Sequence, residues 1–301
     1  MSVSQEVYDE LFRQREEELQ RGNFDKALEF CEHALQIAHE LGSQDLVHRT
    51  VYNRSAIQLE LGEHKLAEEG LREIILRSNK PSIICGAAYN LAVSMKGQKR
   101  WDRSRIFAEM AMENARTLDG DLWVARCHNL LGNLHLCQSN ADDAVKEYHK
   151  SLQLRLGQKG DTRFPRAILL DNIGYCGLLN GDYHKGLGRI HEALDLATEI
   201  SASRCLAESL QDLCFGYMKL GELDQAAGYG ERALNLAEEQ QYPEVIRNCY
   251  YLLSEVYHLA DEEQLSDDYL EKLQALFPDI PYLRDFLRTF DVSNIIALKS
   301  P

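Results

Sequence analysis

The stretches Gly181-Asp-Tyr-His-Lys-Gly186 and Gly221-Glu-Leu-Asp-Gln-Ala226 share one layout and begin 40 residues apart, at 181 and 221. Each starts with a glycine and reaches a small residue five positions later. Related copies begin at positions 22, 62, 99, 139 and 261, so seven copies follow one another at spacings of 37 to 42 residues. Glycine at the first position supplies the positive φ with which a helix ends and the chain reverses. The recurrence predicts a chain built from repeated helical hairpins.

Small residues recur at fixed offsets from these turns. In five copies the residue five positions after the turn is Ala27, Ala67, Ala144, Gly186 or Ala226. Seven positions further along the chain, a small or apolar residue recurs, namely Ala34, Ile74, Ala111, Ser151, Ala193 and Ala233. A spacing of seven places both rows on one helical stripe, where small side chains let two antiparallel helices approach closely. No segment shows sustained period-two alternation, so we expect an all-α fold of about seven hairpins without a sheet.

Composition argues against several classes of function. The formal net charge is −15, whereas nucleic-acid binders usually carry a basic face. Apolar runs are too short to span a bilayer, and Met1 to Gln20 is polar and acidic, unlike a signal peptide. The eight cysteines form no C-x-x-C pair and occupy apolar helical positions, which favours a reducing compartment. We expect a cytoplasmic protein that binds neither nucleic acids nor membranes.

These repeats resemble the tetratricopeptide repeat. Asn90 to Ala92, Leu131 to Asn133 and Asn172 to Gly174 are similar to the first-helix signature of that family. The spacing is about 40 residues rather than the usual 34, as in kinesin light chains, spindle-orientation adaptors and the peptide-sensing Rap and PlcR groups. The resemblance implies a right-handed superhelical solenoid in which the first helix of each hairpin lines a concave, peptide-binding groove.

Two regions are expected along the chain. Residues 1–276 form the solenoid, and residues 277–301 form a C-terminal capping helix and tail. Leu283, Phe286, Leu287 and Phe290 fall on one amphipathic stripe that would cover the last hairpin. Alternatively, this helix is offered to a partner or to a second copy of the chain. The apolar tail after it would fold back on the cap or enter a neighbouring groove.

The expected binding residues lie at matching positions of the first helices. An asparagine amide donates to and accepts from a peptide unit, tyrosines bury ligand side chains, and arginines pair with a ligand carboxylate. The amide positions are Asn53, Asn90, Asn129, Asn133 and Asn172, with Asp212 in the sixth repeat. The aromatic positions are Tyr52, Tyr89 and Tyr251, and the cationic ones are Arg49 and Arg126. The alternative is that the amides hold neighbouring helices in place and the tyrosines belong to the core.

Chemistry-bearing motifs are absent from the sequence. It contains no H-E-x-x-H, P-loop, G-x-G-x-x-G or G-x-S-x-G motif, so we expect no catalytic residues, metal or cofactor. The leading hypothesis is a non-enzymatic scaffold or adaptor that holds an extended or helical segment of a partner protein. Two alternatives are a regulatory peptide sensor of the Rap or PlcR kind and an assembly component that forms homo-oligomers through its C-terminal cap.

Overall fold

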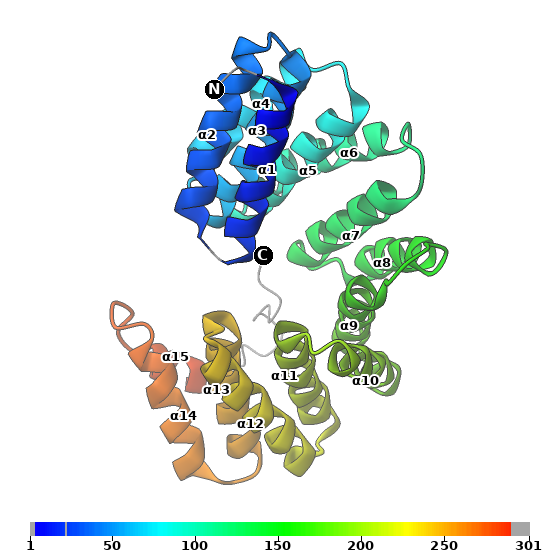
Figure 1. The fold of residues 1–301 in the computed structure, drawn as a ribbon. Helices are drawn as coiled ribbons and strands as arrows, with labels where there is room; N and C mark the ends of the chain where they lie inside the picture. The colour runs from blue at the N-terminus through cyan, green and yellow to red at the C-terminus, as the bar shows by residue number, and fades with distance from the viewer. Residues whose placement is uncertain (1–3, 22, 290–301) are drawn as a thin grey trace. The chain divides into compact units, whose positions relative to one another are not determined.

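The expected helical hairpins are present in a computed structural model that describes residues 4–21 and 23–289 (Figure 1). Over these residues the structure contains fifteen helices and no strand. They are α1 (Gln5–Gln20), α2 (Phe24–Glu40), α3 (Gln44–Glu60), α4 (His64–Arg77), α5 (Pro81–Gly97), α6 (Trp101–Ala115), α7 (Leu122–Cys137), α8 (Ala141–Leu156), α9 (Arg163–Leu179), α10 (Tyr183–Glu199), α11 (Ser203–Leu220), α12 (Leu223–Gln240), α13 (Pro243–Leu259), α14 (Glu263–Ala275) and α15 (Leu283–Thr289). Seven consecutive hairpins, α1–α2 to α13–α14, precede α15, which confirms the predicted all-α array.

The chain divides into two compact units, Met1–Leu134 and His135–Pro301. The boundary falls inside α7. Within each unit a helix packs mainly against the helices before and after it, and the first helices α3 and α5 also touch one another, as do α9 and α11. Within each unit the core is therefore a series of apolar clusters between stacked hairpins, the most extended of which runs from α9 to α15.

The turns lie at the positions that the repeat predicts. Positive φ angles occur at Gly62, Gly181 and Gly221, and the first copy, at Gly22, lies outside the described residues. The remaining copies adopt the same conformation without glycine, with φ of 58° at Lys99, 58° at Ser139 and 61° at Asp261. The reversal of the chain thus requires one left-handed residue in each of these hairpins, whichever residue type supplies it.

The small residues lie where the two helices of a hairpin meet. All members of both rows are buried. In the third hairpin, Ser104 takes the place of alanine, and its hydroxyl donates to the Ala92 carbonyl at 2.6 Å. The tightest approach joins α9 and α10, where a Cβ added to Gly174 would lie 2.7 Å from the Gly186 carbonyl oxygen. Glycine at both positions therefore sets the distance between these two helices.

The last described helix packs on the seventh hairpin. Leu287 of α15 is buried, and Leu283 packs against the same apolar cluster, which includes Leu270 and Leu273 of α14. The capping position predicted for this segment matches these contacts, whereas Phe286 of the predicted stripe is 50% exposed and does not cover the hairpin. Phe290 and the tail, Asp291 to Pro301, lie outside the described residues.

Candidate functional site

Most of the predicted binding residues lie on the first helices of the first unit. Direct contacts join α3 to α5. Arg49 on α3 and Arg126 on α7 are exposed to solvent. Six further predicted residues are half-buried: Tyr52 and Asn53 on α3, Tyr89 and Asn90 on α5, and Asn129 and Asn133 on α7. We call the set Arg49, Tyr52, Tyr89, Asn90, Trp123 and Arg126 the first-helix face.

Tyr52 of α3 packs against α5 and is affected by a charge on α7. Its ring covers Gly86 of α5 so closely that a Cβ on the glycine would lie 2.9 Å from the ring. Burial raises the pKa of the Tyr52 phenol, and the Arg126 guanidinium and a hydrogen bond with the Asn90 side chain partly oppose this shift. One phenol on α3 is thus within the influence of an amide on α5 and a guanidinium on α7.

Aromatic rings lie beneath both exposed arginines. The Arg49 guanidinium stands 4.7 Å from the centre of the Phe12 ring. Arg126 stands 4.9 Å from the centre of the Trp123 ring, and Trp123 meets Tyr89 edge to face at 5.8 Å. Stacking on a ring orients a guanidinium without using its N–H donors. Phe12 and Trp123 were not among the predicted site residues. The signal for Trp123 is its i, i+3 spacing from Arg126.

Asn53 makes contacts within the protein. Its side-chain oxygen accepts from Arg15 of α1, and its nitrogen donates to the Arg49 carbonyl at 2.7 Å. This amide therefore links α1 to α3, as expected if the asparagines hold neighbouring helices in place. For this reason the first-helix face includes the Asn90 amide and not the Asn53 amide.

The second unit buries its predicted site residues. The exposed fractions are 7% for Asn172, 0% for Asp212 and 3% for Tyr251. Asp212 accepts a hydrogen bond from Gln211 at 3.1 Å, and Gln211 in turn accepts from Asn248 of α13 at 3.0 Å. Polar side chains at these positions connect first helices to one another. A row of amides that is open to solvent along both units stays a prediction. The predicted site residues that reach solvent belong to the first unit.

Comparison with known proteins supports the repeat fold. Residues 84–157 match the family model of the tetratricopeptide repeat. The chain has the tetratricopeptide-repeat fold. The resemblance predicted from the spacing of the turns is therefore confirmed, and the matched residues cover most of α5 and all of α6, α7 and α8. No curated protein matches the chain in sequence.

Solved structures with tetratricopeptide repeats are similar along most of the chain. RapI in its apo form has a TM-score of 0.67 at 10% identity, over 91% of this chain and 77% of RapI. A signal-transduction ATPase with a tetratricopeptide repeat sensor from Pyrococcus horikoshii has a TM-score of 0.65 at 17% identity. The match covers 92% of this chain but 48% of that protein, about half its length. A tetratricopeptide repeat protein from Parabacteroides merdae has a TM-score of 0.58 at 15% identity, over 97% and 100% of the two chains.

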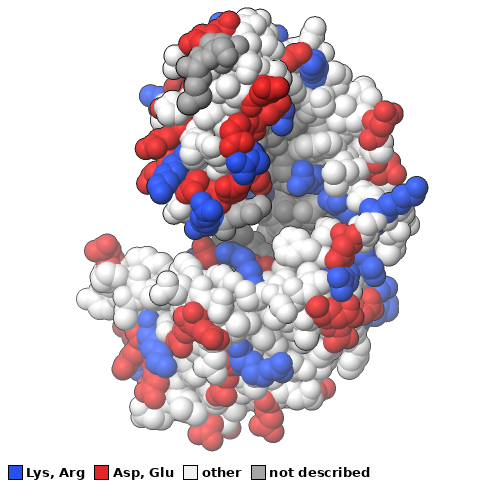
Figure 2. Space-filling model, viewed as in Figure 1, with Lys and Arg blue, Asp and Glu red and all other residues white. Residues whose placement is uncertain are grey.

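The surface of these tetratricopeptide repeats is mixed in charge. Acidic side chains are spread over the visible surface, with lysines and arginines between them (Figure 2). Within the described part of the chain, no group of three or more His, Cys, Asp or Glu residues is placed to hold a metal ion. None of the described helices has the length and apolar character needed to cross a membrane. The arrangement is suited to recognition through cations, rings and amides.

Proposed function

We propose that the chain is a non-enzymatic scaffold that holds a segment of a partner protein on the first-helix face of its first unit. The observation that supports this most is the grouping of two exposed arginines, two tyrosines and one asparagine on α3, α5 and α7. Tetratricopeptide repeats are interaction modules in general, because their stacked hairpins create extended binding surfaces.

The chemistry of this face suits a partner segment that contains a carboxylate and an apolar side chain. Arg49 and Arg126 present guanidiniums that pair with a carboxylate through two parallel hydrogen bonds. The rings of Tyr89 and Trp123 offer apolar area at low conformational cost. The Asn90 amide, on the helix between the two arginines, bonds Tyr52 and has further hydrogen-bonding capacity for a peptide unit of the segment.

The test selects ligands from a library of short random peptides displayed on phage. We expect enriched sequences to combine Asp or Glu with an apolar residue. The double substitution Arg49→Ala with Arg126→Ala should weaken a selected peptide by at least about tenfold, because hydrogen bonds to charged groups contribute about 1.5–3 kcal/mol each.

The matched control is Arg77→Ala, which removes an arginine of α4 whose side chain is 68% exposed and pairs with Glu73. It should leave peptide affinity unchanged. Equal loss in both variants, or selection of basic peptides only, would rule out this face. The two alternatives, a peptide sensor and a self-associating component, stay predictions. A change in scattering radius on peptide binding would support the first, and a concentration-dependent increase in mass the second.

A further inference from the structure

Two stacked tyrosine pairs occupy equivalent places in the sixth and seventh repeats. Tyr217 of α11 stacks on Tyr229 of α12, with ring centres 5.3 Å apart and planes 5° apart. Tyr257 of α13 stacks on Tyr269 of α14 at 5.8 Å and 3°. In both repeats the two tyrosines stand four positions before and eight positions after the turn, at residue 221 or 261. The two pairs are therefore one structural feature that occurs twice.

The first tyrosine of each pair also bonds to the second helix of the preceding repeat. The Tyr217 hydroxyl lies 3.1 Å from Nε2 of His191 on α10. The Tyr257 hydroxyl donates to Glu231 on α12. His191 and Glu231 share a position, ten residues after the turns at 181 and 221. A phenol thus fills a slot between two successive second helices and is anchored at its hydroxyl.

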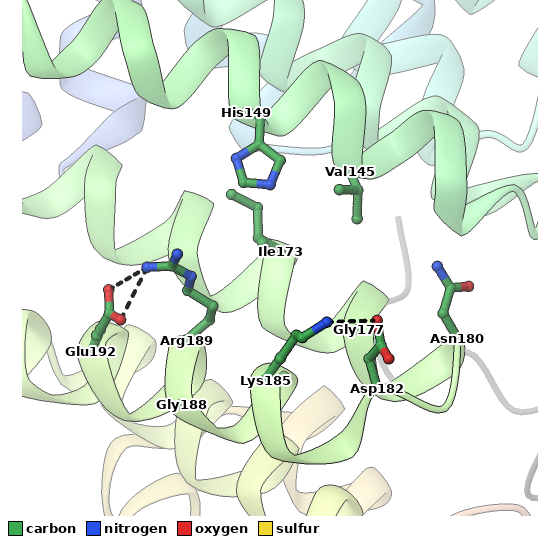
Figure 3. A pocket seen from close by; sticks show the side chains of 11 residues that line it. Val145, His149, Ile173, Gly177, Asn180, Asp182, Lys185, Gly188, Arg189 and Glu192 are labelled. Atoms are coloured by element: carbon green, nitrogen blue, oxygen red, sulfur yellow. Dashed lines mark hydrogen bonds and ion pairs between the residues drawn. The ribbon is translucent and has the colours of Figure 1, made fainter.

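In the fifth repeat the same three positions carry different residues. Gly177 stands where the first tyrosine is expected, Arg189 where the second is expected, and His149 where the anchoring residue is expected. All three line a cavity of about 450 Å³ between α8, α9 and α10 (Figure 3). Val145 and Ile173 add apolar walls. The cavity lies where the phenol lies in the next two repeats, and Gly177 has no side chain to fill it.

We propose that this cavity binds a phenol ring supplied by a ligand. The ring lies over Gly177 between Val145 and Ile173, with its face towards the Arg189 guanidinium and its hydroxyl on His149. The cavity volume is within the range of small-molecule sites. A guanidinium over a ring is already present one repeat further along, where Arg232 stands 5.5 Å from the centre of the Tyr229 ring.

Charge in the cavity favours a neutral ring over an inorganic anion. Arg189 is paired with Glu192 at 2.9 Å and Lys185 with Asp182 at 4.0 Å, so both cations already have carboxylate partners. Burial, followed by the charge of Arg189, lowers the pKa of His149. A neutral imidazole has one nitrogen free to accept a hydrogen bond, which is what a phenol hydroxyl donates.

The test uses p-cresol, which is the tyrosine side chain as a free molecule, and toluene, which lacks the hydroxyl. Methyl NMR signals of Val145 and Ile173 report on the cavity. We expect p-cresol to shift both signals saturably, with a midpoint on the order of 1 mM for so small a ligand. Toluene should bind about fivefold more weakly, because it makes no hydrogen bond to His149.

Two histidine variants test the role of the His149 hydrogen bond, and a peptide probe tests the source of the phenol. His149→Ala should remove the difference between p-cresol and toluene, whereas His191→Ala, at the equivalent position of a filled slot, should leave it intact. A capped Gly-Tyr-Gly peptide separates two sources of the phenol: affinity equal to that of p-cresol indicates a tyrosine of a partner protein, and no binding indicates a free small phenol.

Three outcomes would overturn the proposal. They are the absence of saturable shifts, equal affinity for toluene and p-cresol, and binding of inorganic phosphate in place of p-cresol. Tyr217→Gly provides a positive control, because it should open a second slot beside His191 that p-cresol refills. The site is separate from the first-helix face, so loss of peptide binding there has no bearing on it.

Discussion

Single residues at the hairpin turns carry a conformational cost that is not equal in all repeats. Gly221 adopts φ of 78°, and Lys99 adopts φ of 58° at the equivalent position. The left-handed conformation costs a non-glycine residue about 1–2 kcal/mol, because its Cβ approaches the backbone. The third repeat therefore contains a strained residue that the sixth repeat avoids.

Replacement of this strained residue is expected to stabilise the protein. Lys99→Gly should raise the free energy of unfolding by about 1 kcal/mol. The substitution removes the backbone strain of the folded state, and the greater conformational freedom of glycine in the unfolded chain offsets part of this gain. Gly221→Ala should lower it by a similar amount. The urea concentration at the midpoint of unfolding measures both changes. A loss of stability in Lys99→Gly would contradict the strain argument.

Close approach of two helices makes a different demand on glycine. A Cβ on Gly174 would lie 2.5 Å from a side-chain carbon of Ile190 and 2.7 Å from a backbone oxygen, whereas one on Gly228 would meet nothing within 4 Å. Gly174→Ala should therefore destabilise by about 1–3 kcal/mol through overpacking. Gly228→Ala should stabilise by about 0.5–1 kcal/mol, because alanine favours a helix interior. Calorimetric melting of the two variants should give shifts of opposite sign.

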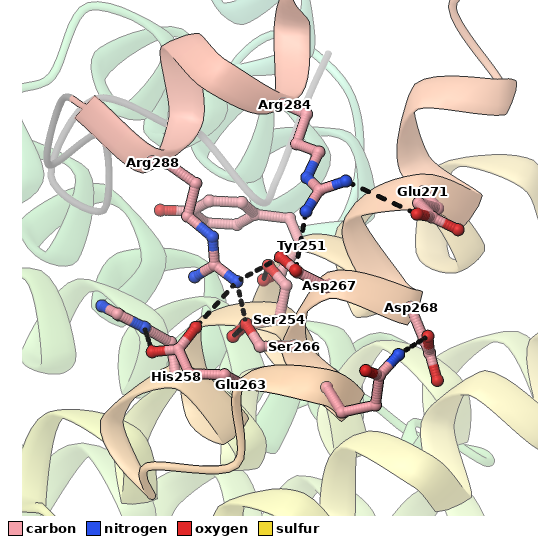
Figure 4. Close-up of polar contacts among 11 residues, drawn as sticks. Tyr251, Ser254, His258, Glu263, Ser266, Asp267, Asp268, Glu271, Arg284 and Arg288 are labelled. Carbon is pink, nitrogen blue, oxygen red and sulfur yellow. Dashed lines mark hydrogen bonds and ion pairs between the residues drawn. The ribbon is translucent and has the colours of Figure 1, made fainter.

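At the scale of one element, α15 is attached by polar contacts as well as by leucines. The two arginines of α15 converge on α14 (Figure 4). Arg284 lies 2.6 Å from Asp267, and Arg288 lies 3.1 Å from the same carboxylate. Arg288 also donates to the Ser266 hydroxyl at 2.7 Å. A helix of seven residues is too short to be stable alone, so these contacts and Leu287 hold it in place.

Removal of the shared carboxylate should release this helix. Asp267→Ala deprives both arginines of a partner, and we expect the amides of Leu283–Thr289 to lose hydrogen-exchange protection while α13 keeps its own. Asp268→Ala is the control, because the Asp268 carboxylate accepts a hydrogen bond at 3.0 Å from Gln264 of its own helix. Retained protection in Asp267→Ala would contradict this prediction and would show that Leu287 and the remaining pairs of Arg284 with Glu271 and of Arg288 with Glu263 hold α15.

The same contact predicts a pH dependence. Hydrogen bonding from Arg288, together with the nearby Arg284 charge, lowers the pKa of Asp267. A carboxyl group with a depressed pKa in the folded state stabilises at pH values above its unfolded pKa, which is about 3.9 for aspartate. That contribution is lost as the pH falls through the lower, folded value. The methyl signals of Leu287 should therefore move towards those of the Asp267→Ala variant as the pH falls below about 4.

At the scale of the whole molecule, the pattern of contacts is local. Helices contact mainly their neighbours along the chain, and even the apolar cluster that runs from α9 to α15 is built from contacts between successive hairpins. In such an array stability is close to a sum over repeats and the interfaces between them. A local defect should then spread over one or two hairpins rather than through the chain.

This locality is open to a direct test. The Gly174→Ala substitution disturbs the contact between α9 and α10, so hydrogen exchange measured by mass spectrometry should rise in α8 to α12. Exchange in α1 to α4 should be unchanged, because these helices belong to the other compact unit. A uniform rise along the chain would mean that the array unfolds as one cooperative body.

Sequence alone determined the repeat and the elements that build it. The turn positions and both rows of small residues were predicted because each follows from a local demand, a left-handed residue or a close helix pair, repeated at one spacing. The same reasoning predicts that Arg49, Tyr52, Asn90 and Arg126 share one face, because all four stand near the starts or middles of the first helices.

Tertiary structure decided which of those residues reach solvent and where a cavity opens. Asn90 and Asn172 hold the same repeat position, yet the first is half-buried and the second is 7% exposed. Burial depends on the side chains that neighbouring helices contribute, which a single repeat does not contain. The cavity at Gly177 likewise depends on tertiary structure, because three helices form its walls at the place that a tyrosine ring occupies in the next two repeats.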